Sequence, residues 1–178
     1  MQLDTQIFPF LVLITHVTLV VGLIWGIVFP EKIKRALGEI APQAPKLALI
    51  VALTATLGSL YYSEILNFPP CNLCWWQRIM TYPQTLILGL TYWRKQKFSL
   101  ESLILSAGGL VLAGYHYVLQ RVEIPSSWCE GVGYTVSCSD TFEMTFGYIT
   151  LPLMAATAFG IIIFLMLVNL KSEITSKI

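Results

Sequence analysis

Charged residues are scarce in this sequence. Only 12% of its 178 residues are charged, whereas 56% are hydrophobic. A soluble domain of this size could not keep so much apolar surface away from water, so the composition excludes an ordinary soluble protein. The net charge of +1 provides no broad basic surface, so no nucleic-acid partner is expected. The sequence therefore predicts an integral membrane protein surrounded by membrane lipid.

The sequence also lacks the usual motifs of protein-bound redox cofactors. It has no glycine-rich dinucleotide motif and no CxxCH haem attachment motif. Cysteine itself is rare, and the four in the chain form two pairs, Cys71 with Cys74 and Cys129 with Cys138. Flavin, haem and nicotinamide binding are not predicted, so any redox chemistry would begin at the cysteine pairs.

Five apolar stretches are long enough to cross a bilayer, which takes about 20 helical residues. They predict an all-α integral membrane fold, a four-helix transmembrane bundle preceded by one additional N-terminal transmembrane helix. We divide the chain into residues 1–45, the additional helix with a basic loop, and residues 46–178, the bundle. The five stretches are residues 7–29, 47–66, 73–93, 100–119 and 148–170.

The basic residues predict the orientation of these five spans. Nine of the eleven lie in connections on one side, which is cytoplasmic by the positive-inside rule. The N-terminus is then outside and the C-terminus inside, in the cytoplasmic (inner) cell membrane. Both cysteine pairs face the extracytoplasmic side, the second of them within the loop 121–146. The nine residues are Lys32, Lys34, Arg35, Lys46, Arg94, Lys95, Lys97, Lys171 and Lys177.

The first cysteine pair lies where a helix is predicted to begin, because Pro69 and Pro70 cannot extend a preceding helix. Free backbone N–H groups at a helix start stabilise a thiolate. Arg78 follows Cys74 by four residues and so shares its helical face. An arginine this deep needs a partner, which a thiolate or the oxygen of a bound electron acceptor would provide.

Three interpretations of the CxxC pair remain open. A redox-active dithiol is favoured by the motif and its position. A structural disulfide would add little to a packed bundle. A zinc site of all four cysteines is disfavoured, because eight residues separate Cys129 from Cys138 rather than two to four.

The second pair lies in a segment rich in glycine, serine and threonine. A structural disulfide could restrain such a loop. Because the CxxC also faces outward, we favour the interpretation that Cys129 and Cys138 pass disulfides between the CxxC and another protein. An exposed disulfide is open to attack by an incoming thiolate. Two pairs in series also need a terminal electron acceptor. For an acceptor at the outer edge of a bilayer, elimination favours a lipid-soluble quinone.

Several segments closely resemble the disulfide bond formation protein family DsbB, especially its short Gram-positive-type branch, BdbC. The family's usual core has four spans, so residues 7–29 are an addition, and His16 within them is expected to bond across helices rather than to catalyse. The resembling segments are residues 58–65 (Gly-Ser-Leu-Tyr-Tyr-Ser-Glu-Ile), 70–79 (Pro-Cys-Asn-Leu-Cys-Trp-Trp-Gln-Arg-Ile), Tyr82-Pro83, His116, the two-cysteine loop and residues 146–152 (Phe-Gly-Tyr-Ile-Thr-Leu-Pro).

The resemblance implies a membrane thiol:quinone oxidoreductase that generates disulfides, with ubiquinone or menaquinone as cofactor. Cys71 and Cys74 match the quinone-proximal pair, with Cys74 contacting the quinone, and Arg78 matches the quinone-site arginine. Cys129 matches the cysteine that forms a mixed disulfide with an extracytoplasmic thioredoxin-like thiol oxidase (DsbA/BdbD-like), and Cys138 would then attack Cys71.

The resemblance also implies that His116 lies near the quinone, although a histidine inside a bundle is more often a packing residue. Two other functions remain open. One is a structural or partner-binding membrane subunit with inert disulfides. The other is a vitamin K epoxide reductase-like quinone reductase, in which the loop pair precedes the CxxC; here the loop pair follows it.

Overall fold

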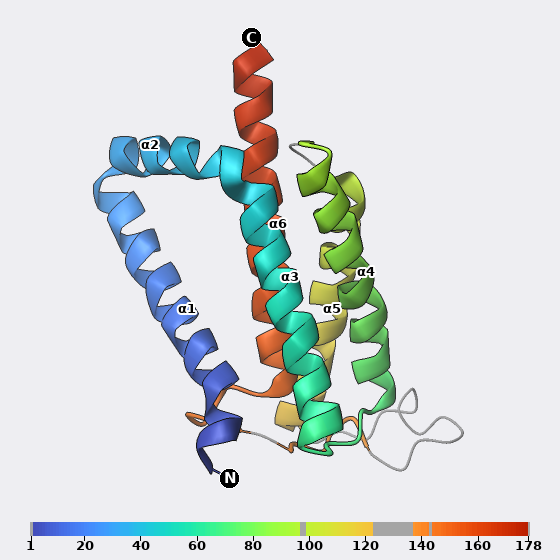
Figure 1. Ribbon diagram of the computed structural model, residues 1–178. Helices are drawn as coiled ribbons and strands as arrows, with labels where there is room; N and C mark the ends of the chain where they lie inside the picture. The colour runs from blue at the N-terminus through green and yellow to red at the C-terminus, as the bar shows by residue number, and fades with distance from the viewer. Residues whose placement is uncertain (1, 97–98, 123–136, 143, 178) are drawn as a thin grey trace.

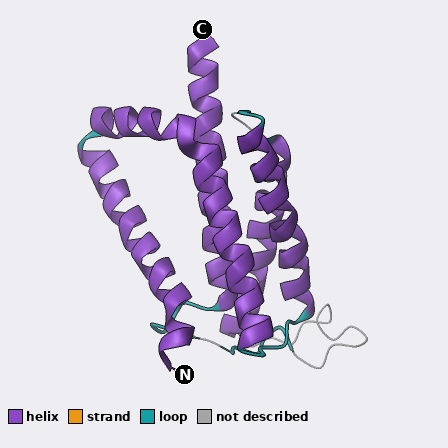
Figure 2. Cartoon of the chain, in the orientation of Figure 1, coloured by secondary structure: helices purple, strands orange, loops and turns teal. Residues whose placement is uncertain are grey.

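The computed structural model describes residues 2–96, 99–122, 137–142 and 144–177, and in these the regular elements are all helical. Figures 1 and 2 show long helices arranged side by side, with one shorter helix lying across their ends. The elements are α1 (Gln2–Val28), α2 (Pro30–Ile40), the 3₁₀ turn η1 (Ala41–Gln43), α3 (Ala44–Leu60), the π-helical turn η2 (Tyr61–Ile65), α4 (Asn72–Trp93), α5 (Leu100–Val122) and α6 (Leu151–Lys177).

Helices α3 to α6 form the bundle, in which α3 packs on α4 and α6, and α5 packs on α4 and α6. Alanines spaced four residues apart give α3 a flat face on which neighbouring helices approach closely. These side chains are buried against large apolar ones from α4 and α6. The buried set is Ala44, Ala48, Ala52, Leu88, Ile162, Leu165 and Met166.

Helices occur at all five predicted apolar stretches. Four helical segments of the described chain are long and apolar enough to span a membrane: Gln6–Val28, Pro30–Ile65, Leu100–Val122 and Leu151–Ser172. Helix α4 is not among them, and it buries polar side chains against its neighbours, including Gln77, Arg78, Thr81 and Gln84. An all-helical fold with several membrane spans is therefore confirmed, whereas the fifth span and the orientation remain predictions.

The basic segment after the first span is helical, whereas the sequence predicted a loop. Helix α2 begins with Pro30 in its first turn, where the missing N–H would have no helical partner. Glu31 lies in the same turn, where its negative charge interacts favourably with the positive end of the helix dipole. Ion pairs Glu31–Lys34 and Arg35–Glu39 lie along it. Figure 1 shows α2 crosswise to the bundle axis, at the end opposite the N-terminus.

Helix α1 stands apart from the bundle over much of its length. Figure 1 shows it near the bundle at its N-terminal end and diverging from it towards α2. The contact is aromatic at this end, where Phe8 packs 5.8 Å, centroid to centroid, from both Tyr61 and Tyr62. Further along α1, His16 bonds to Thr157 and Tyr148, which confirms the prediction that it bonds across helices.

Candidate active site

The CxxC pair lies at the start of α4, as predicted. Cys71 is the N-cap residue in extended conformation, and its sulfur accepts a hydrogen bond from the backbone N–H of Cys74 at 3.4 Å. The two sulfurs are 3.1 Å apart and both cysteines are free thiols. A cysteine that caps a helix receives the field of the first helical N–H groups, which favours its thiolate.

His116 of α5 lies beside Cys71 and is buried. Its Nε2 is 3.7 Å from the Cys71 sulfur and 3.2 Å from the carbonyl oxygen of Cys138. The Gln77 side-chain amide lies 2.9 Å from Nδ1. With the Gln77 amide donating to Nδ1, Nε2 is the ring nitrogen that can donate towards the carbonyl and the sulfur.

These contacts lower the pKa of Cys71, which precedes α4, from 9.0 to about 4. The hydrogen bond with Cys74 has the largest effect, and His116 lowers the pKa further, while burial of Cys71 opposes both. Because the pKa is lowered, Cys71 is a thiolate above about pH 4 in the reduced protein. The site therefore holds one sulfur in the nucleophilic form.

The second cysteine pair meets the first at Cys138. This residue is buried, disulfide-bonded and packed in one cluster with Cys71, Leu73 and Leu119. The structure thus brings together five of the six predicted site residues: Cys71, Cys74, Arg78, His116 and Cys138. Cys129 lies outside the described residues.

Arg78 is buried, and it bonds to Ser59. Its Nε donates to the Ser59 hydroxyl at 3.0 Å and its NH2 group to the Ser59 carbonyl at 3.2 Å. The guanidinium also lies 5.1 Å from the ring centroid of Trp75. Within the described chain the ion pairs are confined to α2, so the charge of Arg78 has no carboxylate to offset it.

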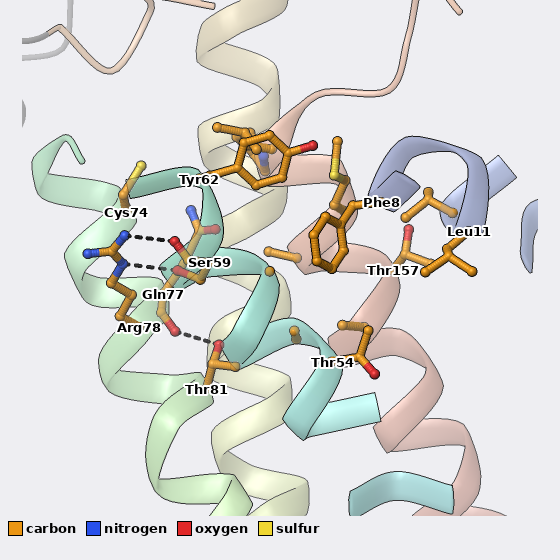
Figure 3. A pocket seen from close by; sticks show the side chains of 18 of the residues that line it. Phe8, Leu11, Thr54, Ser59, Tyr62, Cys74, Gln77, Arg78, Thr81 and Thr157 are labelled. Carbon is orange, nitrogen blue, oxygen red and sulfur yellow. Dashed lines mark hydrogen bonds between the residues drawn. The ribbon is translucent and has the colours of Figure 1, made fainter. Parts of the chain in front are cut away.

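Cys74 and Arg78 border a cavity of about 430 Å³. Figure 3 shows both side chains at one side of it, with the two hydrogen bonds from Arg78 to Ser59 drawn as dashed lines. Gln77 and His116 also line the cavity, whereas the rest of its wall is mainly apolar. Cys71 is not among the lining residues, so the two cysteines of the motif face different surroundings.

Ligand atoms of Cys71, Cys74 and His116 all lie within 4.8 Å of one another, a grouping that could hold a soft metal ion. Cys138 is disulfide-bonded and so offers no thiolate to such an ion. A close dithiol beside an imidazole is equally the arrangement that thiol–disulfide exchange requires.

Gln77 and Ser59 bond to predicted site residues, although the sequence predicts no role for either. A signal existed for Gln77, since a glutamine within an apolar span must find a bonding partner. Ser59 gave no such signal, because a serine in a membrane helix can bond to its own backbone.

Comparison with known proteins supports the resemblance. The model of the family "Disulfide bond formation protein DsbB" matches residues 43–169. A "Probable disulfide formation protein" of Oceanobacillus iheyensis is 38% identical over 139 residues, which cover 76% of this chain and 96% of the relative. "Disulfide bond formation protein C" of Bacillus subtilis is 43% identical over 128 residues, covering 70% of this chain and 89% of the relative.

A third relative, the "SPbeta prophage-derived disulfide bond formation protein B" of Bacillus subtilis, is 40% identical over 132 residues, which cover 74% of this chain and 86% of the relative. No solved structure matches the chain. The family match spans the bundle α3 to α6 and all residues described above as the site, and it leaves α1 and α2 outside. The chain therefore belongs to the disulfide bond formation protein (DsbB) family of multi-pass membrane proteins.

Proposed function

We propose that the protein is a membrane thiol oxidase that passes electrons from an extracytoplasmic thioredoxin-like dithiol through Cys129/Cys138 and Cys71/Cys74 to a quinone. The observation that carries this proposal is the position of the two CxxC cysteines between a cavity and the second pair. Cys71 is buried in one cluster with Cys138, and Cys74 packs against that cluster and also borders the cavity beside Arg78. Of the two, only Cys74 reaches the proposed acceptor site, whereas Cys71 is buried with the second pair.

The outer exchange transfers a disulfide from the loop to the partner. A partner thiolate attacks the loop disulfide at Cys129, and the second partner thiol then displaces Cys129. The partner leaves oxidised, and Cys129 and Cys138 are left as thiols. The net transfer is two electrons and two protons. The partner's identity as a DsbA/BdbD-like protein rests on the family alone.

The inner exchange returns the loop to the disulfide form. The Cys138 thiolate attacks the sulfur of Cys71 in the oxidised CxxC, and Cys74 leaves as a thiolate. Cys129 then displaces Cys71, which closes the loop disulfide and leaves a reduced CxxC. The burial of Cys138 in the same cluster as Cys71 supports this choice of attacked sulfur.

Arg78 and His116 serve different sulfurs in this scheme. The charge of Arg78 stabilises negative charge on the Cys74 thiolate or on an acceptor oxygen, and a low-dielectric cavity strengthens that effect. The Nε2–H of His116 stabilises the thiolate of Cys71, and Gln77 holds the ring in that tautomer. The chain's own residues thus favour the reduced, charged CxxC.

The residues around the cavity fit a quinone. A flat ring with two carbonyl oxygens would receive hydrogen bonds from Arg78 and Gln77, and its apolar parts would contact the remaining wall. When bound, ubiquinone or menaquinone supplies the oxidising power, accepting two electrons and two protons as Cys71 and Cys74 form a disulfide. Since a quinone is a far stronger oxidant than a protein dithiol, each exchange runs towards partner oxidation.

The membrane arrangement belongs to the same proposal. It places α4 as a fifth span, the N-terminus outside and the C-terminus inside the cell membrane, and both cysteine pairs on the extracytoplasmic side. Residues 1–45 add a helix to a bundle formed by residues 46–178. The position of α2 at the end of the molecule opposite the CxxC supports it, because α2 holds three of the basic residues expected in the cytoplasm.

The test is quinone reduction by the purified full chain with a reduced thioredoxin-like donor, followed by quinone absorbance. We expect donor-dependent turnover that disappears in Cys74→Ser and in Cys129→Ser. Cys129→Ser should still reduce quinone when its CxxC is reduced chemically, whereas Cys74→Ser should not. Absence of turnover in folded protein with reducible cysteines would favour a subunit with inert disulfides. Turnover only in the reverse direction, from quinol towards the partner, would favour a quinone reductase.

A further inference from the structure

Helix α1 lies outside the family match and yet borders the cavity of the candidate site. The matched region begins at residue 43, whereas α1 ends at Val28. Phe8, Leu11, Val12 and Thr15 of α1 are among the residues that line the cavity. An element beyond the family bundle thus contributes one wall of the space that Cys74 and Arg78 face.

The residues that line the cavity are polar beside Arg78 and mainly apolar elsewhere. Cys74, Gln77, Arg78 and His116 form its polar part, in which Arg78 bonds to Ser59 of α3. From Ser59 its lining extends along α3 to Ile50, a helical distance of roughly 14 Å, between α1 on one side and α6 on the other. A molecule with a polar head and a slender apolar extension matches this shape.

The hydroxyl groups along the apolar part of the cavity are already bonded within their own helices. Thr15, Thr54 and Thr157 each donate to the backbone carbonyl one turn earlier, at distances of 2.9, 2.9 and 2.8 Å. A hydroxyl that has donated its proton presents mainly its methyl group and carbon atoms to the space beside it. This stretch of the cavity therefore selects for hydrocarbon.

Two contacts hold α1 in place as a wall. The Phe8 ring lies so close to Gly58 of α3 that a Cβ there would be 2.9 Å from its nearest carbon. The second contact is made by His16, further along α1. Its Nε2 lies 2.9 Å from the Thr157 hydroxyl, and its Nδ1 lies 3.3 Å from the Tyr148 hydroxyl. Because Thr157 has donated its own proton, Nε2 is the donor in that bond.

We propose that the apolar part of the cavity, between α1, α3 and α6, is a channel that holds the isoprenoid tail of the quinone. An isoprenoid chain is apolar and slender, which suits the lining that α1, α3 and α6 provide. The inference rests on the proposed quinone oxidase function and assigns α1 a part in acceptor selection.

The test compares two valines of α1. Val12 lines the cavity, whereas Val17 does not line it and is 55% exposed. Val12→Phe and Val17→Phe make the same chemical change on the two faces. Binding of menadione, which has no tail, and of menaquinone with two isoprene units is titrated in the same nanodiscs by quenching of tryptophan fluorescence. Comparing each variant with wild type cancels the partition of the tailed compound into lipid.

We expect Val12→Phe to weaken binding of the tailed compound on the order of tenfold, because it fills space that the tail would bury. Menadione binding should stay within twofold, and Val17→Phe should change neither. An equal loss for both compounds would place Val12 at the ring site and overturn the channel. No change for either would also overturn it, as when a lipid acyl chain or nothing occupies this space. If wild type binds neither quinone, the proposed function fails and this inference with it.

Discussion

Arg78 of α4 is anchored on Ser59 of α3 by two hydrogen bonds, one to the hydroxyl at 3.0 Å and one to the backbone carbonyl at 3.2 Å. Ser59 lies one residue before the end of α3, where the helix widens into the π-helical turn η2. A buried guanidinium keeps its charge when its N–H groups are bonded, and here the partners are neutral. Among the described residues, the charge is therefore fixed in position by hydrogen bonds and not by an ion pair.

Replacing Ser59 by alanine should loosen this anchor. We expect the KM for quinone in Ser59→Ala to rise about tenfold, since a hydrogen bond to a charged group contributes about 1.5–3 kcal/mol and the carbonyl contact remains. Steady-state quinone reduction measures the change. Tyr82→Phe is the matched control, because the Tyr82 hydroxyl donates to the same Ser59 oxygen at 3.3 Å without carrying charge. Equal effects of the two variants would show that orientation of Arg78 is not what Ser59 provides.

The lowered pKa of Cys71 predicts how the reduced protein titrates. The thiolate should persist as the pH falls from neutral and be lost only near pH 4, because its pKa lies at about 4 rather than 9.0. Ultraviolet absorbance of the thiolate follows this titration, with Cys71→Ser as the reference that lacks it. In His116→Phe the midpoint should move upward but stay below 9.0, since the hydrogen bond with Cys74 has the larger effect. Loss of the thiolate already near neutral pH would contradict the prediction.

The sequence predicted the helices of the bundle well, because long apolar runs bounded by charge leave few alternatives. Its error at α2 has a physical cause. Hydropathy alone predicts a loop for residues 30–40, because the segment contains several charged residues and a proline. Its proline stands at the first helical position and its charges form pairs within the helix, so both features support the helix.

The candidate site was predictable in its residue types but not in its pairings. The spacing of Cys71, Cys74 and Arg78 placed the pair and the arginine at one helix start. The bonds from Gln77 to His116 and from Arg78 to Ser59 join residues on different helices, 39 and 19 positions apart. Such contacts depend on how α4 packs against α3 and α5, and no local pattern encodes that packing.

Two glycines of α5 should respond oppositely to alanine. Gly109 faces the Phe159 ring of α6 so closely that a Cβ would overlap it, whereas nothing lies within 4 Å of a Cβ at Gly114. Gly109→Ala should destabilise the protein by about 1–3 kcal/mol, because Phe159 is buried in the core and cannot easily move away. Gly114→Ala should be neutral or stabilising by about 0.5–1 kcal/mol, through lower backbone entropy in the unfolded chain.

Thermal unfolding in detergent, followed by loss of helical circular dichroism, compares these two variants under one condition. Because both changes add the same methyl group to the same helix, their difference reports the local space and not helix propensity. Equal midpoints for Gly109→Ala and Gly114→Ala would mean that α5 and α6 pack less closely than described.

The contact between Phe8 and Gly58 predicts an energetic coupling between α1 and the bundle. Gly58→Ala alone should lower the unfolding midpoint, because its Cβ would lie 2.9 Å from the Phe8 ring and displace it. In the Phe8→Ala background the same change should cost nothing, since the space is vacant and alanine favours the helix. The coupling in this double-mutant cycle should be on the order of 1 kcal/mol. Additive effects of the two substitutions would show that α1 does not rest on Gly58, and that its place as a wall of the cavity needs another anchor.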